Sequence, residues 1–258
     1  MVSGELINTL RADFQDYLNN FKSERYNEDP IVVKTIAHIG KVVDNIRVLA
    51  VSLELNENEK IVAELIAKYH DIGRLWILVP ENMEKKIADH AEASVEYLKT
   101  NTIFNQLDET TQHIIIQVIK NHNKPDLPKK EGEAVLFYAM LIRDADKLET
   151  WRSTVESITR KNGRPNLAAE LSISNKPFVT PSFIKIIMEG GIPNKHEIVT
   201  LNDYIIFQMA WIFELHLKKS FQILNQKQFI RQLYDVLPKN DPVIEVYRAI
   251  RIYIENKI

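Results

Sequence analysis

Six residues in the first half of the chain have the side chains that most often bind metal ions in proteins. They are His38, His70, Asp71, His90, His122 and Asp146. The four histidines fall in four different predicted helices, at or near helix ends or on inward-facing sides. Imidazoles and carboxylates that converge inside a helical bundle form metal sites. Because the set contains nitrogen and oxygen donors but no thiolate, it suits iron, manganese, cobalt, nickel or zinc better than copper(I) or an iron–sulfur cluster.

The central feature is the run His70-Asp71-Ile72-Gly73, which follows an amphipathic helix that carries apolar residues at helical spacing. We expect Gly73 to end that helix, because glycine accepts the left-handed conformation that closes many helices. A helix carboxyl end favours a cation. For an isolated pair, a helix-terminal histidine followed by a capping aspartate is the simpler interpretation. The other histidines and Asp146 favour a metal site.

Apolar residues recur at helical spacing along most of the chain, and the sequence contains only 7 Gly and 10 Pro. No stretch alternates strictly between polar and apolar residues, so we expect an all-α fold. The segments 74–82, 123–132 and most of 166–194 are predicted loops. The predicted helices cover about 6–21, 30–55, 56–71, 83–99, 109–122, 133–161, 183–188, 201–224, 227–237 and 241–256.

The composition is that of an ordinary globular protein, with 258 residues, 45% hydrophobic and 26% charged. The net charge is −2, and no basic stretch alternates with aromatic residues, so nothing indicates a nucleic-acid partner. The absence of cysteine excludes disulfides and thiolate catalysis, and it fits a reducing compartment. Residues 1–14 do not resemble a signal peptide. The longest apolar-rich run, 204–215, is too short to span a membrane. We therefore expect a cytoplasmic protein without membrane segments.

These residues resemble the HD-domain superfamily of metal-dependent phosphohydrolases, and in particular the subgroup with the His-Asp-Ile-Gly form of the motif. The superfamily pattern is a histidine, a His-Asp pair and a later aspartate, all on helices. His38, His70-Asp71 and Asp146 match this order, and the similarity extends over about residues 30–161. In relatives the last aspartate often precedes a basic residue. This points to Asp146, which Lys147 follows, rather than to Asp144.

Members of the superfamily with two metals supply two further histidines, and His90 and His122 are the matching candidates. The resemblance thus implies two divalent ions that share Asp71, with magnesium also left open. A metal pair about 3.5–4 Å apart lowers the pKa of water and neutralises phosphate charge. Each ligating imidazole needs an acceptor for its other ring nitrogen, and Asp89 and Asp144 lie nearby in the sequence.

Basic residues near the motif are candidates for phosphate recognition. We assign Arg74, Lys124 and Lys147 to substrate binding, and Asp71 and Lys147 to the catalytic group. One departure concerns the cyclic-dinucleotide phosphodiesterases of a related subgroup, which have paired histidines followed by a loop with Gly-Tyr-Pro. This chain has Asn121 in place of one of those histidines and lacks the loop. Activity on cyclic dinucleotides is therefore in doubt.

The sequence favours a metal-dependent phosphohydrolase that acts on a small phosphorylated metabolite or nucleotide through a metal-activated water. The alternative is a non-catalytic nucleotide-binding or regulatory HD domain, and a purely structural helical scaffold is a third interpretation. We expect an N-terminal helical segment at 1–29, an HD domain at 30–161 and a helical extension at 162–258 packed on it. Aromatic side chains near Trp211 suit either the core or a homodimer face.

Overall fold

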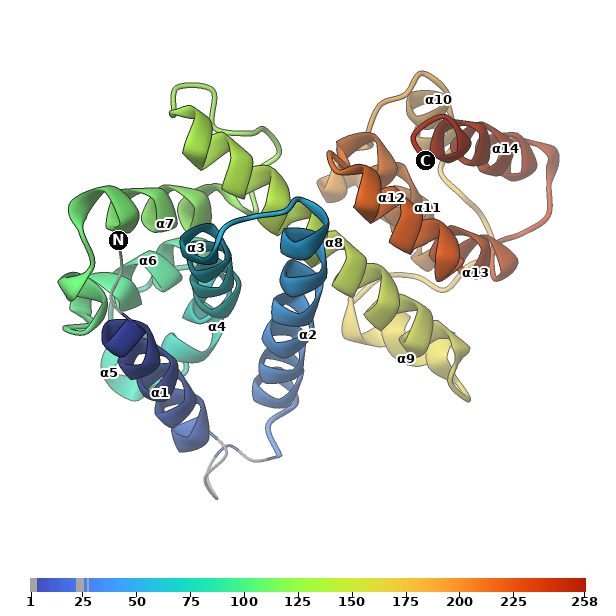
Figure 1. Ribbon diagram of the computed structural model, residues 1–258. Coiled ribbons are helices and arrows are strands. Elements are labelled where there is room, and N and C mark those ends of the chain that lie inside the picture. The colour runs from blue at the N-terminus through green and yellow to red at the C-terminus, as the bar shows by residue number, and fades with distance from the viewer. Residues whose placement is uncertain (1–3, 22–25, 27) are drawn as a thin grey trace. The chain divides into compact units, whose positions relative to one another are not determined.

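The computed structural model describes residues 4–21, 26 and 28–258 (Figure 1). Parts of the predicted N-terminal segment, at residues 1–3, 22–25 and 27, lie outside the described residues. Helices dominate the described residues, which contain no strand beyond one isolated bridge between Ser174 and Thr200. The predicted all-α fold is therefore confirmed. In this described part of the chain, no helix is long and apolar enough to cross a bilayer.

The chain divides into two compact units, Met1–Asp146 and Lys147–Ile258. The division lies inside helix α8 (Glu133–Thr159) and differs from the predicted domain boundary at 161/162. That boundary, and the packing of the last helices on the HD domain, stay predictions.

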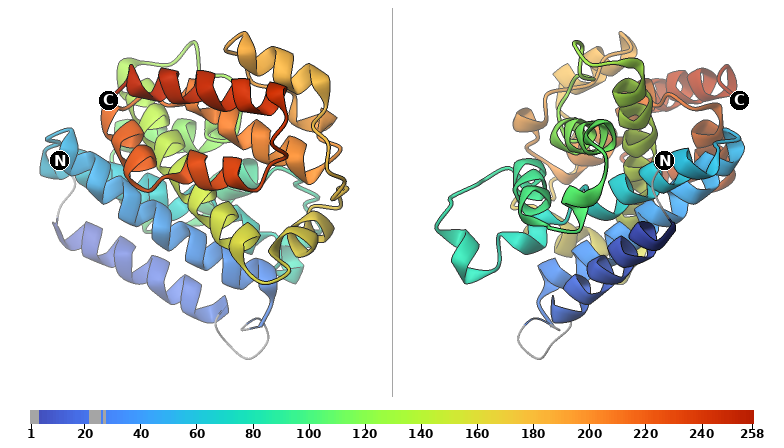
Figure 2. Two further views of the ribbon diagram at one scale, coloured as in Figure 1. Left: turned by 90° about the vertical axis from the view of Figure 1, so that its right-hand side faces the viewer. Right: turned by 60° about the vertical axis from the view of Figure 1, so that its left-hand side comes forward.

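The first unit is a helical bundle in which α2 packs on α3, α3 on α7, α4 on α6 and α6 on α7. Figure 2 shows α2 (Pro30–Ser52) as one unbroken helix of this unit. The helices of this unit are α1 (Gly4–Phe21), α2 (Pro30–Ser52), α3 (Glu57–Tyr69), α4 (Gly73–Trp76), α5 (Pro80–Met83), α6 (His90–Thr100), η1 (Phe104–Gln106), α7 (Glu109–Asn121) and the first half of α8 (Glu133–Thr159).

Side-chain caps fix where several of these helices begin, and they do so at the positions that the sequence predicts. Asp29 accepts hydrogen bonds from the first backbone amides of α2, and Pro30 occupies the first helical position. Asn56 and Glu59 form a capping box at the start of α3. Asp108 caps α7. These caps set the start of three helices whose later residues carry the candidate ligands.

Gly73 differs from the prediction, because it begins α4 and does not adopt the left-handed conformation. A Cβ atom at this position would lie 2.2 Å from the His90 carbonyl oxygen and 2.4 Å from the Ser94 backbone nitrogen. Glycine is therefore required for the close approach of α4 to α6, and the prediction that it ends a helix by a left-handed turn is wrong.

Other boundaries also differ from the prediction. The helix expected at 83–99 begins only at His90, because Asp89 caps it by accepting a hydrogen bond from the Ala91 amide. The expected loop 74–82 contains the short helices α4 and α5. These differences place His90 at the first position of α6 rather than within a longer helix.

The second unit contains the rest of α8 and a set of shorter helices. In this unit α10 packs on α14 and α11, and α11 packs on α13 and α9. Two expectations are wrong here. Helix α9 begins at Gly163 and runs into the expected loop 166–194, and the expected helix 201–224 is broken by extended residues 215 and 217. The helices are α9 (Gly163–Glu170), α10 (Pro181–Met188), η2 (Lys195–Glu197), α11 (Leu201–Ala210), η3 (Trp211–Glu214), α12 (Lys218–Gln226), α13 (Phe229–Asp235) and α14 (Asp241–Glu255).

The aromatic residues near Trp211 were expected to belong either to the core or to a homodimer face. They are half-buried within the second unit. The Trp211 ring packs against Phe207 at 5.4 Å and against Trp151 at 6.2 Å between centroids. Phe213 packs against Tyr253 at 4.9 Å. These contacts lie within the second unit, and a homodimer stays a prediction.

Candidate metal centre

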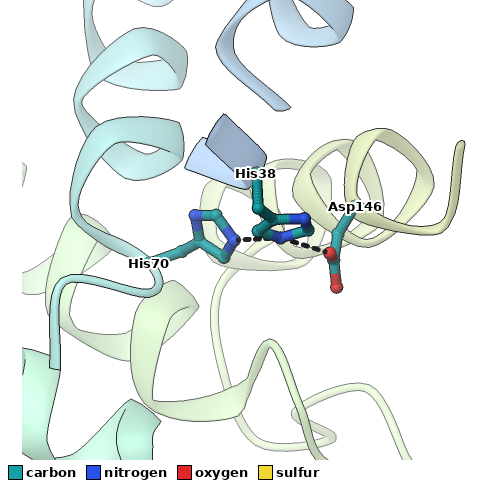
Figure 3. A group of neighbouring side chains, drawn as sticks. All are labelled: His38, His70 and Asp146. Atoms are coloured by element: carbon teal, nitrogen blue, oxygen red, sulfur yellow. Dashed lines mark hydrogen bonds and ion pairs between the residues drawn. The ribbon is translucent and has the colours of Figure 1, made fainter. Parts of the chain in front are cut away.

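All six candidate ligands lie in the first unit, and the fold brings them together from five helices or helix ends. Figure 3 shows His38, His70 and Asp146 converging from three different parts of the chain. His38 comes from α2, His70 and Asp71 from the end of α3, His90 from the start of α6, His122 from the end of α7 and Asp146 from α8.

One group of ligand atoms surrounds Oδ2 of Asp71. His38 Nε2 lies 3.4 Å from His70 Nε2 and 3.1 Å from Oδ1 of Asp146. Oδ2 of Asp71 lies 3.7 Å from His38 Nε2 and 3.9 Å from His70 Nε2. Two imidazole nitrogens from separate helices thus lie near the same carboxylate oxygen, and the Asp146 carboxylate lies against one of them.

A second group surrounds the other oxygen of the same carboxylate. Oδ1 of Asp71 lies 3.2 Å from His90 Nε2 and 3.6 Å from His122 Nε2. The two imidazole nitrogens lie 3.3 Å apart. Asp71 therefore stands between two groups of nitrogen donors and offers one oxygen to each.

Backbone carbonyls fix the ring orientation of two histidines. His70 Nδ1 lies 2.8 Å from the carbonyl oxygen of Ala67, and His122 Nδ1 lies 2.7 Å from that of Ile119. Because a carbonyl oxygen only accepts hydrogen bonds, each Nδ1 carries the proton, and Nε2 of the neutral ring keeps its lone pair. The Nε2 atom of each ring lies inside the cluster, 3.9 Å from Asp71 for His70 and 3.6 Å for His122. We expected acceptors for these nitrogens, but the sequence did not indicate these two carbonyls.

Burial sets the protonation of the cluster. It lowers the pKa of His70 to about 4, although the charge of Asp71 acts in the opposite direction. It also lowers the pKa of His90 to about 4. Burial raises the pKa of the Asp71 carboxyl, but His70, His122 and Arg74 outweigh this effect and hold the pKa well below its usual range. At neutral pH the His70 and His90 imidazoles are therefore neutral, and the Asp71 and Asp146 carboxylates are ionised.

Asp71 is only 4% exposed, yet none of the described residues donates a hydrogen bond to its Oδ1. An ionised oxygen with no donor is costly in a protein interior. Here its nearest neighbours are imidazole nitrogens, and that of His122 presents a lone pair. A cation between these atoms would satisfy them all, so the residues fit a divalent metal with nitrogen and oxygen ligands.

Arg74, a predicted substrate-binding residue, lies at the edge of this cluster. Its Nε donates to Oδ2 of Asp71 at 2.7 Å, and one terminal nitrogen lies 3.3 Å from His90 Nε2. The side chain is 44% exposed. The guanidinium thus connects the buried carboxylate with the surface.

Ser94, which sequence reasoning missed, joins two of the ligand-bearing segments. Its hydroxyl accepts a hydrogen bond from the Gly73 amide at 2.8 Å and lies 2.9 Å from the carbonyl oxygens of His70 and His90. The signal in the sequence was only a serine one helical turn after His90, which is too common a pattern to single out.

The other two predicted basic residues have carboxylate partners. Lys124 forms an ion pair with Asp89, which also accepts a hydrogen bond from Asn123 at 2.7 Å. The Nζ atom of Lys147, the first residue of the second unit, lies 3.0 Å from Glu214. The roles of both lysines in substrate binding, and of Lys147 in catalysis, stay predictions.

Residues 35–151 match the family model of the HD domain. This range contains all six candidate ligands and agrees with the resemblance seen in the sequence. It does not distinguish the His-Asp-Ile-Gly subgroup from the rest of the family. Searches of curated proteins and of solved structures found no match.

Proposed function

We propose that this chain is a metal-dependent phosphohydrolase of the HD-domain superfamily, because residues 35–151 match the family model of the HD domain. HD domains belong to a superfamily of metal-dependent phosphohydrolases that also includes non-catalytic members. The observation that carries the proposal for this chain is the buried Asp71 carboxylate. Its Oδ1 receives no hydrogen bond from the described residues and faces imidazole nitrogens on one side, while Oδ2 faces a second set.

We assign the ligands to two positions. His38, His70, Asp71 and Asp146 would hold one ion, and Asp71, His90 and His122 would hold the other. Divalent ions held in this way supply Lewis acidity, which lowers the pKa of water and neutralises charge on a phosphate ester. Asp71 belongs to both positions, and we count it as a catalytic residue for that reason. The ring orientations of His70 and His122 support the assignment.

Arg74 would bind the phosphate group of the substrate. Its guanidinium already contacts Asp71 and is partly exposed, so it can donate to a phosphate oxygen at the mouth of the cluster. Lys124 is held beside the start of α6 by Asp89 and would add a second positive charge. Lys147 is proposed as a further phosphate-binding and catalytic residue because it directly follows Asp146 in the chain.

The proposed substrate is a small phosphorylated metabolite or nucleotide, hydrolysed by a metal-activated water. A net charge of −2 and the lack of a basic stretch interleaved with aromatic residues favour a small substrate over a nucleic acid. We do not extend the proposal to cyclic dinucleotides, because Asn121 stands where their hydrolases have a histidine.

Metal analysis combined with a substrate screen tests the proposal. The purified protein should contain up to two divalent ions per chain and should hydrolyse at least one compound from a panel of nucleotides and sugar phosphates. Chelation should abolish the turnover, and returning manganese, iron, cobalt, nickel, zinc or magnesium should restore it. Bound metal without any turnover would instead favour a regulatory nucleotide-binding HD domain, and absence of metal would favour a helical scaffold.

A further inference from the structure

A second concave site lies in the first unit between α1, α2 and α3. Its volume is about 360 Å³, and its lining contains none of the six candidate ligands. Pockets that bind small molecules have volumes of roughly 300–1,000 Å³ and combine apolar walls with a few polar groups. The size of this site is therefore sufficient for a small organic ligand. The chemistry of its lining decides which class of ligand binds.

Part of the pocket lining is apolar. Phe14 and Leu18 contribute from α1, and Ile36, Ile39 and Val43 contribute from α2. These side chains gain free energy when an apolar ligand body removes their surface from water.

Two cations at one end of the pocket retain hydrogen-bonding capacity. Among the described residues, Arg47 has ion pairs only at 3.6 Å with Asp44 and at 3.9 Å with Glu64, and both distances exceed a normal hydrogen bond. Lys68 Nζ lies 3.7 Å from Glu64 and 4.7 Å from the centroid of the Phe14 ring, and its side chain is only 15% exposed.

Glu64 makes its hydrogen bonds to Arg11, which donates to both of its oxygens, and its single charge is shared among three cations. The two hydrogen bonds from Arg11 measure 3.1 and 2.8 Å. The lining itself contains three basic residues, including Lys41, but one acidic residue. The pocket therefore presents an excess of positive charge beside its apolar side chains, and this combination favours an anion with an apolar body.

Gly40 lies in the middle of α2 and lines the same pocket. A glycine in the middle of a helix is less favourable than alanine. Neither the backbone nor close packing requires it here, since its φ is not positive and a Cβ atom would meet nothing within 4 Å. The missing side chain leaves space in the pocket, which is an observation independent of the two cations.

We propose that this pocket binds a small amphipathic organic anion. Its carboxylate or phosphate head pairs with Lys68 and Arg47, and its apolar body lies against α1 and α2 next to Gly40. The inference goes beyond the proposed hydrolase activity and does not depend on it. The pocket shares α2 and α3 with His38 and His70, so an occupant contacts the helices that carry two of the candidate metal ligands.

Isothermal titration calorimetry on the full chain tests the proposal with four probes of equal chain length: octanoate, octyl phosphate, octylammonium and octanol. One or both anions should bind with one site per chain, and at least tenfold more tightly than octanol or octylammonium. The comparison of the two anions identifies the preferred head group. Equal binding of all four probes, or no binding of either anion, would overturn the proposal.

Substitutions then locate the site. Arg47→Gln and Lys68→Gln should each weaken anion binding about tenfold, because each removes a charged partner. Gly40→Leu should abolish binding by filling the pocket, while the helix itself is not harmed by leucine. Lys60→Gln is the matched control, since Lys60 lies on α3, pairs with Glu57 and does not line this pocket. Wild-type affinity in Gly40→Leu, with a folded circular-dichroism spectrum, would refute the assignment.

Discussion

Two buried aspartates, one in each unit, have opposite surroundings. Asp203 in the second unit is completely buried and accepts hydrogen bonds from the Thr180 amide at 2.7 Å, the Thr180 hydroxyl at 2.9 Å and the Thr200 amide at 3.0 Å. Asp71 in the first unit is 4% exposed, and its donor is Arg74 on one oxygen only. Its other neighbours are imidazole nitrogens at 3.2 to 3.9 Å.

The difference shows that burial of a carboxylate does not by itself indicate a metal site. Asp203 is surrounded by N–H and O–H donors, so its charge is already compensated and it stabilises the junction of a loop with α11. Asp71 faces imidazole nitrogens, and those of His70 and His122 carry lone pairs. A further cation is therefore needed to balance the negative charge of the Asp71 carboxylate. A buried aspartate that accepts hydrogen bonds from N–H and O–H groups has a structural role. A buried aspartate whose neighbours present lone pairs is a candidate metal ligand.

The largest expected effect is that of Asp71→Ala, which removes the carboxylate common to both proposed ion positions. Both metals should be lost, because the two cations would repel each other without it. Changes to residues behind a ligand cost about 10–100-fold in metal affinity or activity, so loss of a shared ligand should reduce turnover at least 100-fold. Elemental analysis and a turnover assay on the same preparation measure both quantities. A variant that keeps two ions per chain would disprove the shared role.

Asp203→Ala should produce the opposite pattern. It removes a buried acceptor and leaves at least two donors without a partner, so the free energy of unfolding should fall by about 3 kcal/mol. Metal content per folded chain should stay at the wild-type value. Urea denaturation gives the free energy, and elemental analysis of the folded fraction gives the metal. If Asp203→Ala lost metal as Asp71→Ala does, the distinction between the two aspartates would fail.

His90→Ala and His122→Ala should have a smaller effect than Asp71→Ala, because each removes one ligand from the group around Oδ1. We expect each variant to lose mainly one ion of two, with activity reduced about 10–100-fold. His113→Ala is a matched control, since His113 is exposed on α7 and pairs with Glu131 at 3.4 Å. Wild-type metal content and wild-type rate in both variants would mean that His90 and His122 are ordinary structural histidines.

The sequence predicted most helices because their apolar periodicity and caps are local properties. Asp29, Asn56 and Asp108 could be recognised as caps from neighbouring residues alone. The same local reasoning gave the wrong role for Gly73. A glycine that permits a left-handed turn and a glycine that permits two helices to approach look the same in a sequence, and only the position of α6 in space distinguishes them.

The candidate ligands could also be chosen from the sequence, since histidines on separate helices and a His-Asp pair form an ordered pattern. Their convergence depends on tertiary packing, as does the division of the two oxygens of Asp71 between two groups. The carbonyls of Ala67 and Ile119 could not be predicted as partners, because every residue has a carbonyl and only the ring orientation selects one.

The smallest expected effect concerns buried hydroxyls of the first unit. Burial raises the pKa of Tyr97 and of Tyr138 to about 12, whereas an unfolded tyrosine titrates near 10. The folded state therefore holds these protons more strongly. Their contribution to stability is fully present below about pH 10 and is lost as the pH rises through about 12. The free energy of unfolding should be flat from pH 8 to 10 and should then fall, by an amount on the order of 1 kcal/mol for each group.

Urea denaturation at a series of pH values measures this decline, and Tyr138→Phe provides the control. Phenylalanine cannot ionise, so the variant should show a shallower decline above pH 10, at the cost of the weak hydrogen bond from the Tyr138 hydroxyl to the Glu59 carbonyl at 3.4 Å. This decline should be independent of metal, because it comes from hydroxyls outside the candidate cluster. If chelation removed the decline, the pH dependence would come from the ligands around Asp71. The distinction between metal-binding polar groups and purely structural ones would then be wrong.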